Sequence, residues 1–510
     1  MKMLVLIILD GFGIAGTGQG NAVMLAKKPN FDALMKTYPH TEIAASGVDV
    51  GLPAGQQGNS EVGHMNMGAG RVVYQDLTLI SKAIDDGVFF ENPAFLGAIE
   101  NCKRNNSALH IMGLLSDGGV HSHNTHLYAL LELAARHGLK DVYVHAFTDG
   151  RDTPPQSAID YVRELQAKMA EIGVGRIATV CGRYYIMDRD NRWERVEKGY
   201  NALVLGEGEY NDDPINGIER SYANGVTDEF IEPIVITSGG APIAKISPND
   251  SVINFNYRKD RAREFTRALV DENFAGFERE IFPVHYVCMT LYDREIKNVS
   301  VAYPPQNFEN CLAEYIAKKG LKQFHIAETE KYAHVTFYFN GGVERAYEGE
   351  ERTLIPSEKV ATYDLSPKMR AFEIKDGVLE YVKSREYAFG VVNFANPDML
   401  GHTGNISAAV TGIEAMDECL GEIIDVICET GSTAIVTADH GNAEAMIDGE
   451  TGKPCTSHTT NPVPLIVVNG GNVELRGGGR LADIAPTCLE LMKLPKAAEM
   501  TGESLIASRN

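Results

Sequence analysis

The stretch LVLIILDGFG, residues 4–13, gives the strongest indication of the fold. An unbroken apolar run ends in an aspartate and a glycine, which is typical of a strand buried on both faces of a parallel sheet. A signal peptide would instead place small residues at a cleavage site after the apolar run, so we interpret the segment as a strand. Asp10 then lies at the carboxyl end of that strand, where open α/β sheets bind their ligands.

Other short apolar runs alternate with segments of helical period, and this alternation predicts an α/β fold with mostly parallel sheets flanked by helices. The expected strands are 4–9, 109–115, 142–147, 177–180, 252–255, 335–339, 389–394 and 434–437, and the expected helices are 125–137, 157–172, 262–272 and 408–429. The stretch 70–86 and the Pro-Pro segment 303–307 indicate connections between domains. The residues between these connections are numerous enough to form a second domain inserted into the first.

The composition excludes several classes of protein. The chain has 510 residues, with 47 Lys and Arg against 69 Asp and Glu, and its formal net charge is −22. This acidic balance argues against nucleic acid or an anionic membrane as a partner, because both attract basic surfaces. No apolar run reaches the ~18 residues of a membrane span. The eight cysteines form no CxxC pair, which favours reduced thiols in a cytoplasmic protein.

Carboxylates and imidazoles follow several of the expected strands. They are Asp10, Asp398 and His402 in NPDMLGHTG, Asp439 and His440 in TADHGNAE, and His458 in TSHTT. Carboxylate and imidazole without thiolate are ligands for Mn²⁺, Mg²⁺, Zn²⁺ or non-haem iron, and this set is large enough for two ions. Each motif alone also fits a helix cap or a surface imidazole, but their recurrence at strand ends predicts metal binding.

Ser60, in the segment QGNSEVGH, is a candidate nucleophile. A helix that starts at this point would favour an anion at its N-terminus. The alternative is that Ser60 only caps that helix. A nearby metal ion would favour the nucleophile, because coordination lowers the pKa of a hydroxyl group.

Arginines follow the strands of the middle segment. They are Arg151, Arg183, Arg189, Arg258 and Arg261. Guanidinium groups bind carboxylate and phosphate through paired hydrogen bonds, although aspartates nearby also allow ordinary surface ion pairs. The recurrence at strand ends favours a small phosphorylated carboxylate as the ligand. Asp152 is then a candidate acid–base group.

Taken together, these motifs resemble the cofactor-independent (2,3-bisphosphoglycerate-independent) phosphoglycerate mutases of the alkaline-phosphatase-like superfamily. The resemblance runs from LDGFG through GNSEVGH, SDGGVHSH, DGRDTPP, GRYYIMDRD, NYRKDRAR and ETEKYAHVTFYFNGG to NPDMLGHTG, TADHGNAE and TSHTTNPVP. Tyr257 and Lys259 stand where the family more often has Phe and Pro, which leaves the arginines in place. The resemblance implies a discontinuous phosphatase-like metal-binding domain, residues 1–76 and 311–510, and an inserted transferase domain, residues 77–310.

The resemblance also implies roles for the site residues. One metal ion would be held by Asp398, His402 and His458, and a second by Asp10, Ser60, Asp439 and His440. Ser60 would become phosphoserine, Asp152 would move protons, and Lys331 would stabilise the phosphoryl group. The substrate would be bound by His121, Arg151, Asp152, Arg183, Arg189, Arg258, Arg261 and Lys331. Mn²⁺ is favoured over Mg²⁺, Co²⁺ or Zn²⁺, because hard oxygen ligands share both sites with imidazole.

The implied reaction interconverts 3-phosphoglycerate and 2-phosphoglycerate in glycolysis or gluconeogenesis, through a phosphoserine and without 2,3-bisphosphoglycerate, in a monomeric enzyme. We expect the two domains to close over the substrate, with hinges near 70–76 and 303–307, because water would hydrolyse the phosphoserine. The alternatives are a metal-dependent phosphatase or another phosphomutase of the superfamily, and a non-catalytic phosphometabolite-binding protein.

Overall fold

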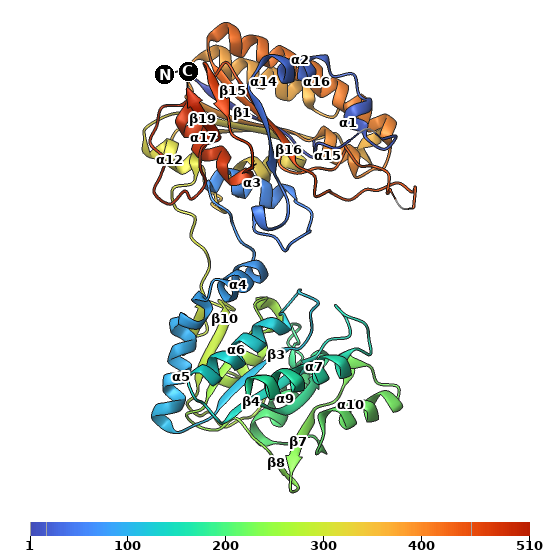
Figure 1. Cartoon of the computed structure of the whole chain (residues 1–510), viewed down its shortest axis with the longest axis vertical. Helices are drawn as coiled ribbons and strands as arrows, with labels where there is room; N and C mark the ends of the chain where they lie inside the picture. Colours follow the sequence, from blue (N-terminus) through green and yellow to red (C-terminus); the bar gives the residue numbers. More distant parts are fainter. Residues whose placement is uncertain (1, 17, 450, 510) are drawn as a thin grey trace. The chain divides into compact units, whose positions relative to one another are not determined.

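The computed structural model describes residues 2–16, 18–449 and 451–509. Residues 1, 17, 450 and 510, which belong to the expected first domain, lie outside the described residues. The chain divides into two compact units, one made of Met1–Gln75 with Asn307–Asn510 and the other of Asp76–Gln306. Each unit is a mostly parallel sheet flanked by helices (Figure 1), which confirms the predicted fold class.

The first unit is built on an eight-stranded sheet with the order β13-β12-β14-β1-β15-β16-β2-β18. Its strands are β1 Leu4–Leu9, β2 His40–Ala44, β12 Gln323–Glu328, β13 Glu350–Ile355, β14 Phe389–Phe394, β15 Thr433–Thr437, β16 Val463–Val468 and β18 Gly479–Arg480. Only β16 runs antiparallel to its neighbours β15 and β2 among these described strands. A separate antiparallel pair joins β17 Val473–Leu475 and β19 Ile506–Arg509.

Helices cover both faces of this sheet, with α2, α14 and α16 on one side and α3, α12 and α17 on the other (Figure 1). The helices are α1 Ala22–Leu25, α2 Pro29–Thr37, α3 Ser60–Ala69, α12 Leu312–Lys318, α13 Thr329–Ala333, α14 Ala371–Ser384, α15 Asn396–Gly401, α16 Ile406–Thr430 and α17 Ile484–Leu491. Shorter helical segments are η1 Gly47–Val50, η6 His334–Tyr338, η7 Tyr363–Leu365 and η8 Leu481–Asp483.

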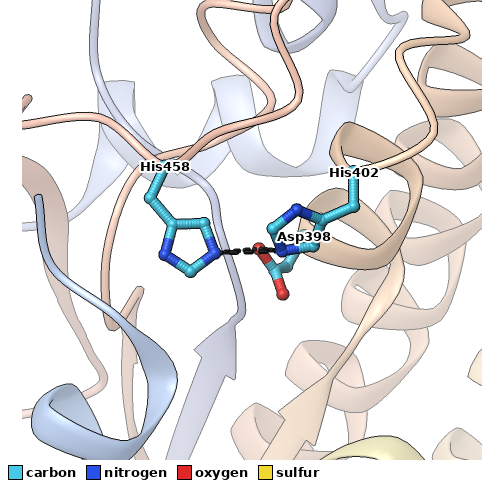
Figure 2. A group of neighbouring side chains, drawn as sticks. All are labelled: Asp398, His402 and His458. Carbon is cyan, nitrogen blue, oxygen red and sulfur yellow. Dashed lines mark hydrogen bonds and ion pairs between the residues drawn. The ribbon is translucent and has the colours of Figure 1, made fainter. Parts of the chain in front are cut away.

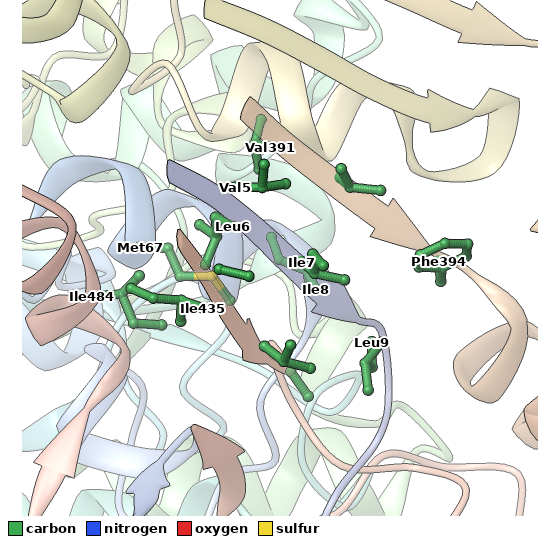
Figure 3. Packing of buried hydrophobic residues seen from close by; sticks show 14 of the residues in the cluster. Val5, Leu6, Ile7, Ile8, Leu9, Met67, Val391, Phe394, Ile435 and Ile484 are labelled. Carbon is green, nitrogen blue, oxygen red and sulfur yellow. The ribbon is translucent and has the colours of Figure 1, made fainter. Parts of the chain in front are cut away.

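The hydrophobic core of the first unit is centred on β1. Residues 5–9 have no exposed surface, and Figure 3 shows them between side chains of the neighbouring strands, with Met67 of α3 and Ile484 of α17 nearby. Burying each such side chain contributes about 1.5–3 kcal/mol. The packing therefore holds the carboxyl end of β1, and with it Asp10, in a defined place.

The second unit contains a nine-stranded sheet with the order β11-β10-β9-β3-β4-β5-β7-β6, in which β8 pairs with β7. Its strands are β3 Leu109–Leu114, β4 Val142–Thr148, β5 Arg176–Gly182, β6 Glu209–Asn211, β7 Ile234–Ser238, β8 Ala241–Pro242, β9 Ser251–Asn254, β10 His285–Thr290 and β11 Val299–Tyr303. The run from β11 to β5 is parallel. Successive residues of β3, such as Ile111 and Met112, belong to separate hydrophobic clusters, as the alternation of a strand requires.

The helices of the second unit complete its two outer layers. They are α4 Asp76–Asp85, α5 Pro93–Asn105, α6 Asn124–Arg136, α7 Ala158–Ile172, α8 Arg183–Ile186, α9 Trp193–Tyr200, α10 Pro214–Ala223 and α11 Arg263–Val270. Shorter helical segments are η2 Val88–Glu91, η3 Asn201–Leu205, η4 Asp228–Phe230 and η5 Lys259–Arg261. Within the described residues, no helix combines the length and the apolar character needed to cross a membrane.

One detail of the expected secondary structure is wrong. The expected strand 335–339 is helical, because α13 continues into the π-helix η6. Val335 and Phe339, four residues apart, are both buried, and the Thr336 hydroxyl donates to the Tyr332 carbonyl. Lys331 lies in α13, directly after the end of β12. Helix α4 begins within the expected connection 70–86, and the two units divide between Gln75 and Asp76.

The central position of β1 predicts a large effect of shortening one of its side chains. We expect Ile8→Ala to lower the free energy of unfolding by about 2–5 kcal/mol, because the surrounding core cannot collapse fully into the cavity. Urea unfolding followed by circular dichroism measures this change. Leu365→Ala is the control: that side chain is 68% exposed, and its loss should change stability by less than about 0.5 kcal/mol. Equal effects of the two substitutions would contradict the packing described.

Candidate active site and metal-ligand clusters

The carboxyl ends of the central strands in the first unit bring the predicted metal ligands together. Asp10 follows β1, Asp398 lies in α15 directly after β14, and Asp439 follows β15; all three are buried. Gly11 allows this convergence, because its φ is +72° and a Cβ there would lie 2.7 Å from Cα of Asp398. A side chain at Gly11 would therefore push the Asp10 turn away from α15.

Ser60 is the first residue of α3 and lies buried in the same site. The helix is capped by the side chain of Asn59, which accepts a hydrogen bond from the backbone N–H of Val62. The interpretation of Ser60 as only the N-cap is therefore wrong. Gly63, on the same helix, lets α3 pack against the Asp439 turn, since a Cβ there would lie 2.8 Å from the Asp439 carbonyl oxygen.

The first ligand cluster consists of Asp398, His402 and His458, whose side chains point toward one another (Figure 2). Nε2 of His402 and Nε2 of His458 are 3.0 Å apart and lie 3.3 and 3.2 Å from Oδ1 of Asp398. Each Nδ1 is 2.8 Å from a backbone carbonyl oxygen and therefore carries the proton of the neutral ring. Two imidazole lone pairs and a carboxylate oxygen then face one point, an arrangement that fits a cation.

The second group surrounds the Ser60 hydroxyl. Oγ of Ser60 lies 3.0 Å from Nε2 of His440 and 3.3 Å from Oδ1 of Asp10. The same imidazole nitrogen is 3.6 Å from Oδ1 of Asp10 and 3.5 Å from Oδ2 of Asp439. Oδ2 of Asp439 is buried and accepts no regular hydrogen bond from the described residues. A buried carboxylate oxygen without a donor needs a cation, so this group also fits a metal ion.

Lys331 supplies a positive charge at the centre of the site. Its Nζ lies 2.6 Å from Oδ1 of Asp10, 2.7 Å from Oγ of Ser60 and 2.7 Å from Oδ2 of Asp398. Burial disfavours the charged amine, but the two carboxylates outweigh it and raise the pKa of Lys331. Burial likewise works against ionised Asp398, yet Lys331 holds its pKa well below the usual range.

The arginines expected to bind substrate gather in the second unit. A cavity of about 210 Å³ is lined by Arg151, Arg183, Arg189 and Arg261, among other residues. His121 and Arg258 are not part of this lining and approach Asp260 instead, at 3.8 and 3.0 Å, while Arg189 lies 3.0 Å from the other oxygen of Asp260. Burial and the neighbouring arginines lower the pKa of Arg261, as expected where positive charges crowd together.

Asp152 is held in place by a buried guanidinium group. Nη1 of Arg183 lies 2.5 Å from Oδ2 of Asp152 and 2.7 Å from Oδ1 of Asp149. Asp149 also accepts the backbone N–H groups of Arg151 and Asp152. Burial and then Arg183 lower the pKa of His121 to about 4, so this imidazole is neutral near pH 7. A neutral imidazole can donate one hydrogen bond to an anion without adding charge.

Several residues of both sites escaped the sequence analysis. They are His64, Asn393 and Glu444 in the first unit, and Asp149, Arg195 and Glu229 in the second. Glu444, for example, accepts hydrogen bonds from the backbone of Gly13 and Asn442 and from the side chain of Asn461. His64, Asp149 and Glu444 stand within motifs quoted above and could have been singled out. Asn393, on a buried strand, and Glu229 carry no local signal.

The fold and this site define a class of protein: an α/β protein with carboxylate–imidazole ligand clusters around a buried serine. The family model described as BPG-independent PGAM N-terminus matches residues 80–294. Over 507 residues the chain is 60% identical to the 2,3-bisphosphoglycerate-independent phosphoglycerate mutase of Acetivibrio thermocellus, covering 99% of each. It is 59% identical over 505 residues to that of Clostridium botulinum, again covering 99% of each.

A solved structure gives the same result. The chain is 34% identical to Leishmania mexicana phosphoglycerate mutase at low cobalt concentration, with a TM-score of 0.55, and the alignment covers 100% of this chain and 98% of that one. The chain belongs to the family of 2,3-bisphosphoglycerate-independent phosphoglycerate mutases.

The position of Lys331 predicts that replacing this lysine destabilises the metal-free chain. Lys331→Met should lower the free energy of unfolding by about 3–5 kcal/mol, because it leaves buried carboxylates without their partner. Urea unfolding in the presence of a chelator measures this loss. The control is Lys322→Met, which breaks a solvent-exposed 3.0 Å pair with Glu386 and should cost no more than about 1 kcal/mol. A Lys331→Met variant as stable as this control would refute the electrostatic role.

Proposed function

We propose that the chain interconverts 3-phosphoglycerate and 2-phosphoglycerate through a phosphoserine on Ser60, without 2,3-bisphosphoglycerate. The proposal rests on the groups around Oγ of Ser60. This oxygen lies 2.7 Å from Nζ of Lys331 and 3.0 Å from Nε2 of His440. A buried hydroxyl surrounded by an ammonium and metal-ligand side chains is arranged for attack on phosphorus. Family membership supports the same reaction and a small-molecule substrate.

The first unit holds the groups that would carry out phosphoryl transfer. Asp398, His402 and His458 would hold one divalent ion, and Asp10, Ser60, Asp439 and His440 a second, with Mn²⁺ as the proposed metal. When bound, such ions lower the pKa of a coordinated hydroxyl and neutralise phosphoryl oxygens. Lys331 is placed to pair with a phosphoryl oxygen on Ser60, since its ammonium group already donates to Oγ. The bond from deprotonated Oγ to phosphorus would form as the bond between phosphorus and the substrate's ester oxygen breaks, and that oxygen would stay on the glycerate.

The second unit holds the groups that would retain the glycerate and move its proton. Arg151, Arg183, Arg189 and Arg261 line the cavity, with His121 and Arg258 nearby as further proposed contacts. Asp152 would give a proton to the leaving glycerate oxygen and then accept one from the other hydroxyl. That second oxygen attacks phosphorus, the bond to Oγ of Ser60 breaks, and the site returns to its starting state.

Three further parts of the proposal concern the whole protein. We propose that the enzyme is a monomer in the cytoplasm, where its eight cysteines stay reduced; Cys102, Cys181 and Cys288, for example, are buried thiols. Closure of the two units over the substrate stays a prediction. It follows from the need to keep water from the phosphoserine.

Replacing the nucleophile tests the proposal directly. Ser60→Ala should reduce turnover by more than about 10⁴-fold, because no covalent intermediate can form. An enolase-coupled assay without 2,3-bisphosphoglycerate, run after chelation and after adding back each metal, measures the activity. Ser384→Ala, a change at an exposed serine, is the control and should leave turnover unaltered. Retained turnover in Ser60→Ala would reject the phosphoserine, and phosphate release faster than isomerisation would favour a phosphatase.

Metal affinity should depend on pH through His402 and His458. The hydrogen bond with Asp398 raises the pKa of His402 in the chain without metal; burial lowers that of His458, but Asp398 outweighs it and the pKa is raised. Because bound metal requires deprotonated rings, affinity should fall as pH drops through these raised values, starting above the ordinary pKa of ~6.5. The protonated pair in turn stabilises the metal-free fold at low pH, and this contribution is lost as pH rises through the raised values.

Calorimetric titration with Mn²⁺ between about pH 6 and about pH 8 checks this dependence. Repeating the titration in buffers of different ionisation enthalpy counts the protons released. We expect weaker binding and more released protons at the lower pH. An affinity that stays constant over this range would contradict the assignment of these imidazoles as ligands.

A further inference from the structure

We propose that His64 and Asn393 form a positioning pair that holds Ser60 and the carboxylates of Asp10 and Asp439 in register for phosphoryl transfer. The inference rests on the proposed function of Ser60 and deepens it. Neither residue of the pair belongs to the proposed metal-ligand or substrate-binding sets. Both are fully buried beneath the site.

His64 connects the nucleophile's helix to a carboxylate on the neighbouring strand end. It lies in α3, one turn after Ser60, and its Nδ1 is 2.9 Å from the Ser60 carbonyl oxygen and 3.3 Å from Oδ2 of Asp439. A carbonyl oxygen can only accept a hydrogen bond, so Nδ1 carries the proton. That N–H donates to the Ser60 carbonyl and faces the Asp439 oxygen, which has no regular donor among the described residues.

Asn393 fixes the other side of the imidazole ring. It lies on β14, and its side-chain nitrogen is 2.7 Å from Oδ2 of Asp10 and 3.0 Å from Nε2 of His64. Lys331 donates to the other oxygen of the same carboxylate at 2.6 Å and favours its ionised form, in which both oxygens can only accept. If the amide were reversed, the side-chain oxygen of Asn393 would face Oδ2 of Asp10, and neither oxygen could donate a hydrogen bond. The amide nitrogen therefore faces Asp10, and its second N–H requires an unprotonated Nε2 on His64.

These contacts decide between two roles for His64. Asp10, His64 and Asp439 place ligand atoms close enough together to hold a metal ion. However, Nδ1 of His64 donates a hydrogen bond to the Ser60 carbonyl oxygen, and Nε2 accepts one from Asn393. A ring with both nitrogens engaged has no lone pair for a metal. We therefore assign His64 to positioning rather than to metal binding.

The pair connects α3 with the ends of β1 and β15, which meet at the site. Asn393 bonds the end of β1, through Asp10, to the ring of His64 on α3, and that ring faces Asp439 beyond β15. The imidazole of His334 packs against His64, with ring centroids 5.5 Å apart. Holding the ring in this way places Oγ of Ser60 relative to the carboxylates, and a displacement of ~1 Å at a reacting group can cost ~10²-fold in rate.

The first test reads the tautomer of His64 in the metal-free wild-type chain, so it does not depend on activity. Nitrogen-15 NMR of histidine-labelled protein distinguishes a protonated from an unprotonated ring nitrogen, and the signal is assigned by its loss in His64→Gln. We expect a neutral ring with the proton on Nδ1. A proton on Nε2, or on both nitrogens, would overturn the proposal, whatever the activity of the variants.

The second test compares His64→Asn with His64→Gln. The Asn amide can take the place of Nδ1 and still donate to the Ser60 carbonyl, whereas the longer Gln amide reaches only the place of Nε2. We expect His64→Gln to lower kcat and Mn²⁺ affinity by about 10–100-fold each, with KM unchanged, and His64→Asn to recover much of the loss. The control is His40→Gln, which removes a ring 3.0 Å from the Tyr38 carbonyl at an exposed position.

The outcomes separate this inference from the proposed reaction. If Ser60→Ala keeps turnover, the phosphoserine proposal fails, while the tautomer and the Mn²⁺ affinities still report on the pair. If His64→Asn and His64→Gln lose kcat equally, or if Mn²⁺ affinity is unaltered in His64→Gln, the positioning role is wrong. A fall in kcat with the same fall in thermal stability for both variants would also reject it, since a merely structural role predicts that result.

Discussion

The site depends on the charge balance between buried carboxylates and Lys331. Asp10, Asp398 and Asp439 meet at one end of a parallel sheet with almost no exposure to solvent. Ionised carboxylates in such a place cost several kcal/mol each unless cations compensate them. One ammonium group lies within 2.7 Å of Asp10 and Asp398, which leaves a negative excess. That excess accounts for the affinity for divalent ions that we propose, and bound ions would in turn let an anionic phosphoryl group enter.

The two units divide the proposed chemistry between them. The first places a hydroxyl among candidate metal-ligand side chains, and the second provides arginines around a small cavity and a carboxylate held by Arg183. The net charge of −22 describes the whole chain, yet it says nothing about these local groupings. An acidic protein can bind an anion where guanidinium and ammonium groups, together with bound metal, outweigh the surrounding carboxylates. In the proposed mechanism part of the acidic excess is itself functional, since it would supply metal ligands and a proton carrier.

The sequence predicted those features that depend on short, local patterns. The apolar run of β1 and the polar residues directly after it identify both the strand and Asp10, and the same holds for Asp439 after β15. Residues 335–339 misled the prediction because β-branched and aromatic side chains suit strands, while the helix that begins at Thr329 continues through them. His64 and Asn393 escaped because their role arises only where α3 meets β14. A contact between residues more than 300 positions apart leaves no local pattern.

The central claim is that phosphorus passes through Ser60, and its stereochemistry tests this claim most directly. Each in-line displacement inverts the configuration at phosphorus. Transfer from the substrate to Ser60 and back involves two displacements, so the account predicts overall retention when phosphoglycerate chiral at phosphorus through oxygen isotopes is converted by the metal-replete enzyme. Overall inversion would mean a single direct displacement and would contradict the account.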